Sequence, residues 1–235
     1  MTTTSLHGFV IHKTRSGESS SYVNIFTKEY GMINALYKGG QTVQKQIQLR
    51  QFTPCWLDFN IKNDRFFLNK LEVIGSTYDL SGKSLFSSLY INELLYYLLP
   101  PLDVNNKIFI TYIECLQALE GTTELRLIEI TLRKFEKILL SELGYEVLFT
   151  LDINTNKSIL DNSYYKYIPG HGFIEDATGV AAKYLFEIQS GNFSNPIALK
   201  IYKNIMRLAI DKALDGKEIR TRKLFINLQP CSRII

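Results

Sequence analysis

Cysteine and histidine are both scarce in this sequence, which contains three of each. Cys55, Cys115 and Cys231 stand far apart and form no C-x-x-C pair, which excludes a zinc ribbon and argues against a disulfide framework. The histidines show no H-E-x-x-H or other metal-ligand spacing. We therefore expect no metal, no cofactor and a reducing compartment.

Long apolar runs are absent as well. The most apolar stretch, residues 85–102, is interrupted by Asn92, Glu93 and a Pro-Pro pair, so it is too polar and too short to span a bilayer. The first residues, MTTTSLHG, lack the charged segment and apolar run of a secretory signal. These features predict a cytoplasmic protein with no membrane partner.

Catalytic motifs are missing too. The chain has no G-x-S-x-G elbow and no phosphate-binding glycine loop, and Lys38-Gly39-Gly40 lacks the spacing of such a loop. His171 stands between two glycines, which favours an exposed turn. The acidic residues of segment 122–143 alternate with Lys and Arg, a pattern typical of a salt-bridged solvent face. We therefore expect no enzyme.

The first 80 residues have the composition of short β-strands. Segments 6–14, 21–27, 32–37, 52–62 and 66–74 are rich in β-branched, aromatic and apolar residues and are separated by turn residues such as Gly31 and Asn63-Asp64. Five short strands in so few residues predict a small closed antiparallel barrel, most commonly an OB-fold. An SH3-like barrel remains the alternative.

The hydrophobic period changes to that of a helix from residue 84 onward. We expect helices at residues 85–99, 106–119 and 122–143, then near 181–189 and at 196–214, with Asn105 and Asn195 as N-caps and Gly144 and Gly216 at the ends. A short helix follows in the basic C-terminal segment. The prediction is an α+β protein: an OB-fold domain at 1–80, and a helical domain at 81–235 with an irregular or β insertion at about 145–178.

Positive charge gathers at both ends of the chain. Residues 1–80 carry 9 Lys/Arg against 6 Asp/Glu, residues 81–199 carry 9 against 14, and residues 200–235 carry 9 against 3. Basic ends around an acidic middle suggest a surface for a polyanion. Core packing is favoured for Tyr22. The candidate DNA-binding residues are cations at strand ends, in loops and near the C-terminus, with one tyrosine: Lys13, Arg15, Tyr37, Lys38, Lys45, Arg50, Arg65, Arg220, Arg222 and Lys223.

Several segments resemble the RecO family of DNA repair proteins. The first is GFVIHKTRSGESSSYVNIFTKEYGMINALYKGGQ, with its Glu-Ser, Phe-Thr, Tyr-Gly and Lys-Gly pairs. Further segments follow in order: LRQFTP at 49–54, LYINELL at 89–95, LRKFE at 132–136, LGY at 143–145 and RTRKLF at 220–225. No single segment is specific, but the series covers most of the chain.

The resemblance implies an OB-fold, a helical body and, in many members, a zinc module after the Leu-Gly-Tyr segment. Residues 150–162 contain no cysteine, so this chain resembles the members that lack the metal. It also implies binding of single- and double-stranded DNA, annealing of strands coated with single-strand-binding protein (SSB), and action with RecR in loading RecA. Such a protein is expected at the nucleoid.

The resemblance further implies capture of the acidic SSB tail, which ends in phenylalanine. An apolar side chain and a carboxylate need an apolar pocket with a cation at its mouth. We expect that pocket beside the third helix, at Phe109, Tyr112, Ile113, Arg133 and Lys134.

Two alternatives remain. One is an OB-fold protein that binds single-stranded RNA without a role in recombination, and the other is an enzyme with a site assembled from scattered residues.

Overall fold

The computed structural model describes residues 2–226 and divides the chain into two compact units. The first unit comprises Met1–Glu124 with Ile219–Ile235, and the second comprises Leu125–Glu218. The expected division into domains at 1–80 and 81–235 stays a prediction.

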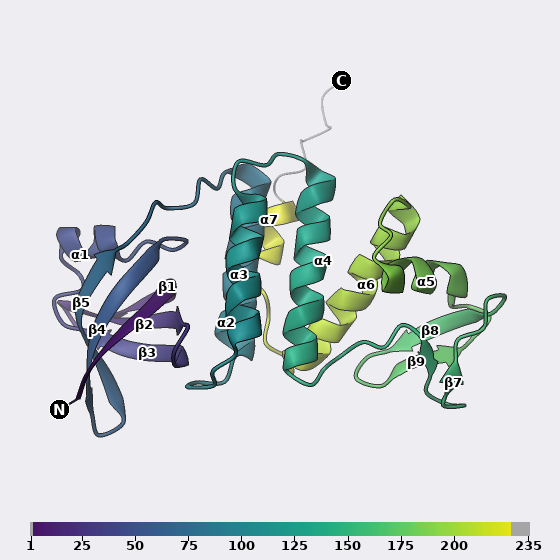
Figure 1. The fold of residues 1–235 in the computed structure, drawn as a ribbon, viewed down its shortest axis with the longest axis horizontal. Helices are drawn as coiled ribbons and strands as arrows, with labels where there is room; N and C mark the ends of the chain where they lie inside the picture. The colour runs from purple at the N-terminus through teal and green to yellow at the C-terminus, as the bar shows by residue number, and fades with distance from the viewer. Residues whose placement is uncertain (1, 227–235) are drawn as a thin grey trace. The chain divides into compact units, whose positions relative to one another are not determined.

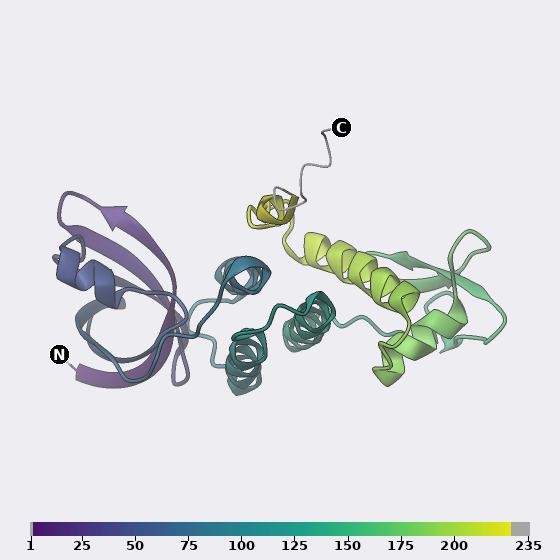
Figure 2. The ribbon, with the colours of Figure 1, turned by 90° about the horizontal axis from the view of Figure 1, so that it is seen from above.

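The first unit begins with five strands that close into a barrel (Figure 1). The strands are β1 (Thr2–Ser16), β2 (Ser20–Thr27), β3 (Gly31–Tyr37), β4 (Pro54–Lys62) and β5 (Arg65–Val73). They follow the order β1-β2-β3-β5-β4, and β4 pairs with β1 to complete the ring visible in Figure 2. The predicted five-strand barrel and α+β class are confirmed, and the barrel is OB-like. The all-antiparallel pairing was wrong, because β3 and β5 run parallel where the ring closes.

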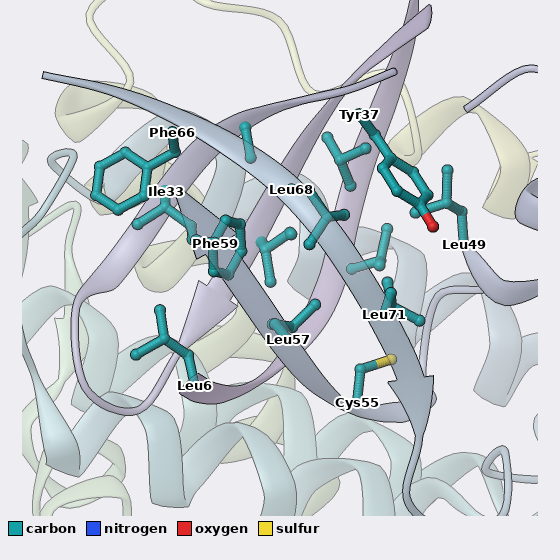
Figure 3. Close-up of a cluster of buried hydrophobic side chains, with 14 residues drawn as sticks. Leu6, Ile33, Tyr37, Leu49, Cys55, Leu57, Phe59, Phe66, Leu68 and Leu71 are labelled. Atoms are coloured by element: carbon teal, nitrogen blue, oxygen red, sulfur yellow. The ribbon is translucent and has the colours of Figure 1, made fainter. Parts of the chain in front are cut away.

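The barrel interior is filled by one alternating set of apolar side chains (Figure 3). Leu57 and Phe59 on β4 are completely buried, as are Val23 and Ile25 on β2, because residues two apart on a strand point to the same face. The turn before β3 needs a glycine: Gly31 has φ +66°, and an added Cβ would lie 1.9 Å from the Asp103 carbonyl oxygen.

Three helices of the first unit follow or accompany the barrel. They are α2 (Gly82–Leu98), α3 (Asn106–Leu119) and α7 (Arg222–Ile226). The Asn105 side chain accepts a hydrogen bond from the Ile108 amide, which confirms the predicted cap of α3. Phe9 and Phe26 of the barrel meet Phe109 and Tyr112 of α3 in edge-to-face or tilted contacts, with ring centroids 5.2–6.2 Å apart.

One further helix, α1 (Val43–Gln48), lies between β3 and β4 and contacts β5. No helix is predicted there from the sequence.

The second unit combines three helices with a small sheet. The helices are α4 (Leu125–Glu142), α5 (Ala182–Ser190) and α6 (Pro196–Ala213). The strands are β6 (Leu151–Asp152), β7 (Lys157–Ser158), β8 (Tyr164–Ile168), β9 (Gly172–Glu175) and β10 (Val180–Ala181), in the order β10-β8-β9-β6-β7. Strands β8 and β9 pair antiparallel within the predicted insertion, and the Asn195 side chain caps α6 by accepting from the Ile197 amide.

Within residues 2–226, no helix combines the length and the apolar character needed to cross a bilayer.

Candidate nucleic-acid interface

Five of the predicted cations gather at one end of the barrel. Lys13 and Arg15 lie on β1 next to the β1–β2 turn, and residues 38–50, which link β3 to β4 and include α1, contribute the others. Acidic residues are sparse here: Glu18 is the one acid in residues 8–27, and residues 38–50 contain none. We call this group the barrel-end cations: Lys13, Arg15, Lys38, Lys45 and Arg50.

Hydrogen bonds from α1 and the preceding loop connect Lys13, Lys38 and Lys45, and they attach the loop to the strand pair that carries Arg15. The Lys13 ammonium donates to the Gln46 side-chain oxygen at 2.7 Å, and the Lys45 ammonium donates to the Lys38 carbonyl at 2.7 Å. The Gln41 side chain donates to the Ser21 hydroxyl, and Ser21 pairs with Arg15 across β1 and β2. Partial burial lowers the pKa of the Lys13 ammonium. The β1–β2 turn and α1 therefore form one cationic surface.

The exposure of the two tyrosines near this surface is the reverse of the expectation from the sequence. Tyr37 is buried in the barrel core at 3% exposure (Figure 3). The Lys45 ammonium lies 4.1 Å from the centroid of its ring. Tyr22, which core packing was expected to bury, is 44% exposed. It pairs with Thr14, between Lys13 and Arg15 on the neighbouring strand. The alternation of β2 explains this, since Val23 and Ile25 point inward and Tyr22 must point outward.

Arg65 lies at the opposite end of the barrel. It pairs with Lys62 at the β4–β5 turn, and the adjacent Ile61 pairs with Thr2 at the start of the long strand β1. Lys13 and Arg15 stand near the other end of that strand. The structure therefore separates Arg65 from the barrel-end cations.

A carboxylate on α2 binds the start of the C-terminal basic segment. Glu93 accepts hydrogen bonds from the amides of Arg220 and Thr221, both at 2.8 Å, and from the Thr221 hydroxyl at 2.7 Å. The Phe225 ring of α7 then meets Phe86 of α2, with centroids 6.3 Å apart. Glu93 thus fixes the start of the segment that carries Arg220, Arg222 and Lys223.

Glu93 also lies near β1, beside His12. The His12 ring stands 4.7 Å from the Tyr96 ring, measured between centroids. Burial lowers the pKa of His12, and the Glu93 carboxylate opposes that shift only in part. Glu93 therefore stands between the C-terminal basic segment and the strand that bears Lys13 and Arg15.

The residues predicted for the SSB tail fall in different environments. In the first unit, Phe109 and Tyr112 are buried against the barrel, and Ile113 is half-buried. In the second unit, the buried Arg133 guanidinium lies 2.8 Å from the Glu136 carboxylate, whereas Lys134 is exposed. An ionic group is rarely buried without such a pairing, so Glu136 accounts for the position of Arg133.

Aromatic packing holds the insertion at 145–178, where the family resemblance raised the question of a zinc module. Phe149 lies 5.5 Å from Phe173 and 5.5 Å from Tyr202 between ring centroids, and all three side chains are buried. No three His, Cys, Asp or Glu side chains of the described chain are grouped to hold a metal ion. The residues present at 145–178 do not fit a zinc site.

Comparison with known proteins covers nearly the whole chain. Residues 1–76 match the family described as "Recombination protein O N terminal", and residues 81–211 match "Recombination protein O C terminal". The DNA repair protein RecO of Legionella pneumophila strain Corby is 41% identical over 226 residues, covering 96% of this chain and 99% of that protein. Its counterpart in Salmonella paratyphi B is 32% identical over 228 residues, covering 94% and 93%. The chain therefore belongs to the RecO family of non-enzymatic DNA repair and recombination proteins.

Proposed function

We propose that this protein binds DNA through the barrel-end cations, anneals complementary strands coated with SSB, and acts with RecR to load RecA at the nucleoid. The observation that supports DNA binding is the group of cations on β1 and around α1 of an OB-like barrel, together with the exposed Tyr22 on the neighbouring strand β2. Annealing and the action with RecR and RecA rest on membership of the RecO family.

The chemistry of this surface suits a single strand. Lys and Arg neutralise phosphates and release condensed counterions, which makes affinity depend on salt. An exposed aromatic ring offers a stacking platform that any unpaired base can use. The barrel-end cations supply the first element and Tyr22 the second. The same proposal includes the C-terminal segment, because Glu93 holds its start near β1. The cations of that segment are Arg220, Arg222 and Lys223.

Salt dependence tests this assignment. Replacing Arg15, Lys38 and Arg50 together with Gln should weaken binding of every single-stranded sequence, because all three exposed side chains would contact phosphates. Each lost contact should lower the slope of log affinity against log salt by about 0.7, or by about 2 for the triple variant.

A matched control removes the same charge from the other end of the barrel. Lys28, Lys62 and Arg65 are also exposed, and their replacement with Gln should leave the slope near that of the wild type. Equal slopes in both triple variants and the wild type would show that DNA binds elsewhere.

The SSB tail belongs to the same proposal, on the helical part of the chain. Arg133 is a poor test residue, because its loss would leave the buried Glu136 carboxylate without this guanidinium and would cost about 3–5 kcal/mol of stability. Lys134 is exposed, so Lys134→Ala should weaken binding of a labelled tail peptide by about 1–3 kcal/mol, the scale of a lost charge-assisted contact. If the peptide affinity is unchanged and DNA binding is intact, the SSB tail binds at a site that does not include Lys134.

A further inference from the structure

Helix α1 is amphipathic, but its apolar face points to solvent and not to the barrel. None of its residues is buried, and its two apolar residues, Val43 and Ile47, are 77% and 53% exposed. They are four residues apart, so they share one face of the helix. A helix on a folded domain normally turns such a face toward the core.

The polar residues of α1 make its contacts with the barrel. Lys45 donates to the Lys38 carbonyl and lies over the Tyr37 ring. Gln46 accepts from Lys13 and donates to the Gly40 carbonyl. These bonds fix the orientation of the helix, which lies at the barrel beside β5 (Figures 1 and 2). The outward apolar face is therefore held in place by its own polar neighbours.

The charge around this face indicates what covers it. Lys38 and Arg50 flank the helix, Lys13 is bonded to it, and the segment from Lys38 to Arg50 has no acidic residue. An occupant must then be both anionic and apolar. Single-stranded DNA has both properties, since phosphates alternate with bases whose faces are apolar.

The exposure of the two side chains favours DNA over an acidic peptide. A peptide that ends in an apolar side chain and a carboxylate needs a pocket. Val43 protrudes from the surface instead of lining a hollow. Protruding apolar side chains are the means by which several DNA-binding proteins enter between bases and unstack them.

We infer that Val43 and Ile47 form an apolar wedge that contacts and unstacks the bases of a single strand held by the barrel-end cations. The wedge rests on the proposed DNA-binding function and adds to it the separation of neighbouring bases. Strands kept unstacked expose their pairing edges, which suits a protein that brings complementary strands together.

The test replaces both residues with Gln, a good helix former that keeps the polar contacts of α1. The probe is a single-stranded oligonucleotide carrying a fluorescent adenine analogue that brightens when unstacked. The wild type should raise the emission on binding. Val43→Gln with Ile47→Gln should bind about tenfold more weakly, as expected for lost apolar contact. It should keep the wild-type salt slope, because no phosphate contact is lost, and its saturated complex should be dimmer.

The matched control is Val73→Gln with Ile74→Gln, two apolar residues at the end of β5 that are 49% and 53% exposed. This control should bind and brighten the probe like the wild type. Unchanged affinity and emission in the α1 variant would overturn the wedge. So would a loss of SSB-tail peptide binding with DNA binding intact, which would assign the face to a peptide.

The outcome separates the wedge from the proposed function. If the Arg15, Lys38 and Arg50 variant loses salt slope while the α1 variant behaves as the wild type, DNA binds the cations and the wedge alone is wrong. If neither variant changes binding, both proposals are wrong.

Discussion

Glu93 holds the C-terminal basic segment, so its removal should release that segment from α2. Two backbone amides and one hydroxyl donate to this carboxylate at 2.7–2.8 Å. A hydrogen bond to a charged acceptor contributes about 1.5 kcal/mol at the lower end of the usual range. The two amide bonds alone then contribute about 3 kcal/mol, which is about a hundredfold in the docking equilibrium.

Hydrogen exchange measures this release directly. In Glu93→Ala, the amides of Arg220 and Thr221 should exchange about a hundredfold faster than in the wild type, since exchange follows the local opening free energy. Glu93→Gln keeps one carbonyl acceptor and should fall between the two. Trypsin should also cleave sooner at the basic residues of this segment.

An exposed acid on α3 provides the control for this measurement. Glu114 on α3 is an exposed acid, and Glu114→Ala should leave exchange at Arg220 and Thr221 unchanged. If Glu93→Ala has the same exchange rates and cleavage pattern as the wild type, the three bonds do not dock the segment and our reasoning about its position fails.

Three further predictions concern other parts of the molecule. Tyr22→Ala should weaken single-strand binding by about 1–3 kcal/mol without changing the salt slope, while Tyr22→Phe should retain affinity; equal losses in both would exclude stacking. Because burial lowers the pKa of His12 below its ordinary 6.5, the unfolded chain binds the proton more readily, and stability should fall as the pH drops below about 6.5. Urea unfolding at several pH values should show that fall in the wild type and a smaller one in His12→Gln; identical pH profiles would contradict the assignment. Phe173→Ala should destabilise the second unit by about 3–5 kcal/mol, whereas a chelator should leave wild-type unfolding unchanged; stoichiometric zinc in purified protein would refute the second part.

The strands and long helices could be predicted because local pattern specifies them. Alternation sets the barrel strands, and Asn105 and Asn195 cap helices where the sequence placed them. The parallel pairing of β3 with β5 could not be predicted, because it depends on how the ring closes and not on either strand alone.

At the candidate sites, the sequence predicted wrongly which side chains are buried and which are exposed. Helix α1 is not predictable from hydrophobic periodicity, because its apolar residues face water and its polar residues face the barrel. The exposure of Tyr22 could have been predicted, because Val23 and Ile25 alternate with it along β2 and point inward. The burial of Arg133 follows from Glu136 three residues later on the same helix face, a pairing that sequence alone does not distinguish from a solvent-exposed one.

The central claim is that the barrel-end cations serve strand annealing, and one measurement tests it most directly. Complementary oligonucleotides are coated separately with SSB and mixed, and duplex formation is followed with the wild type and with the Arg15, Lys38 and Arg50 to Gln variant. We predict fast annealing by the wild type, a large loss in this variant, and no loss in the Lys28, Lys62 and Arg65 control. Failure of the wild type to anneal coated strands, or equal annealing by both triple variants, would contradict the account.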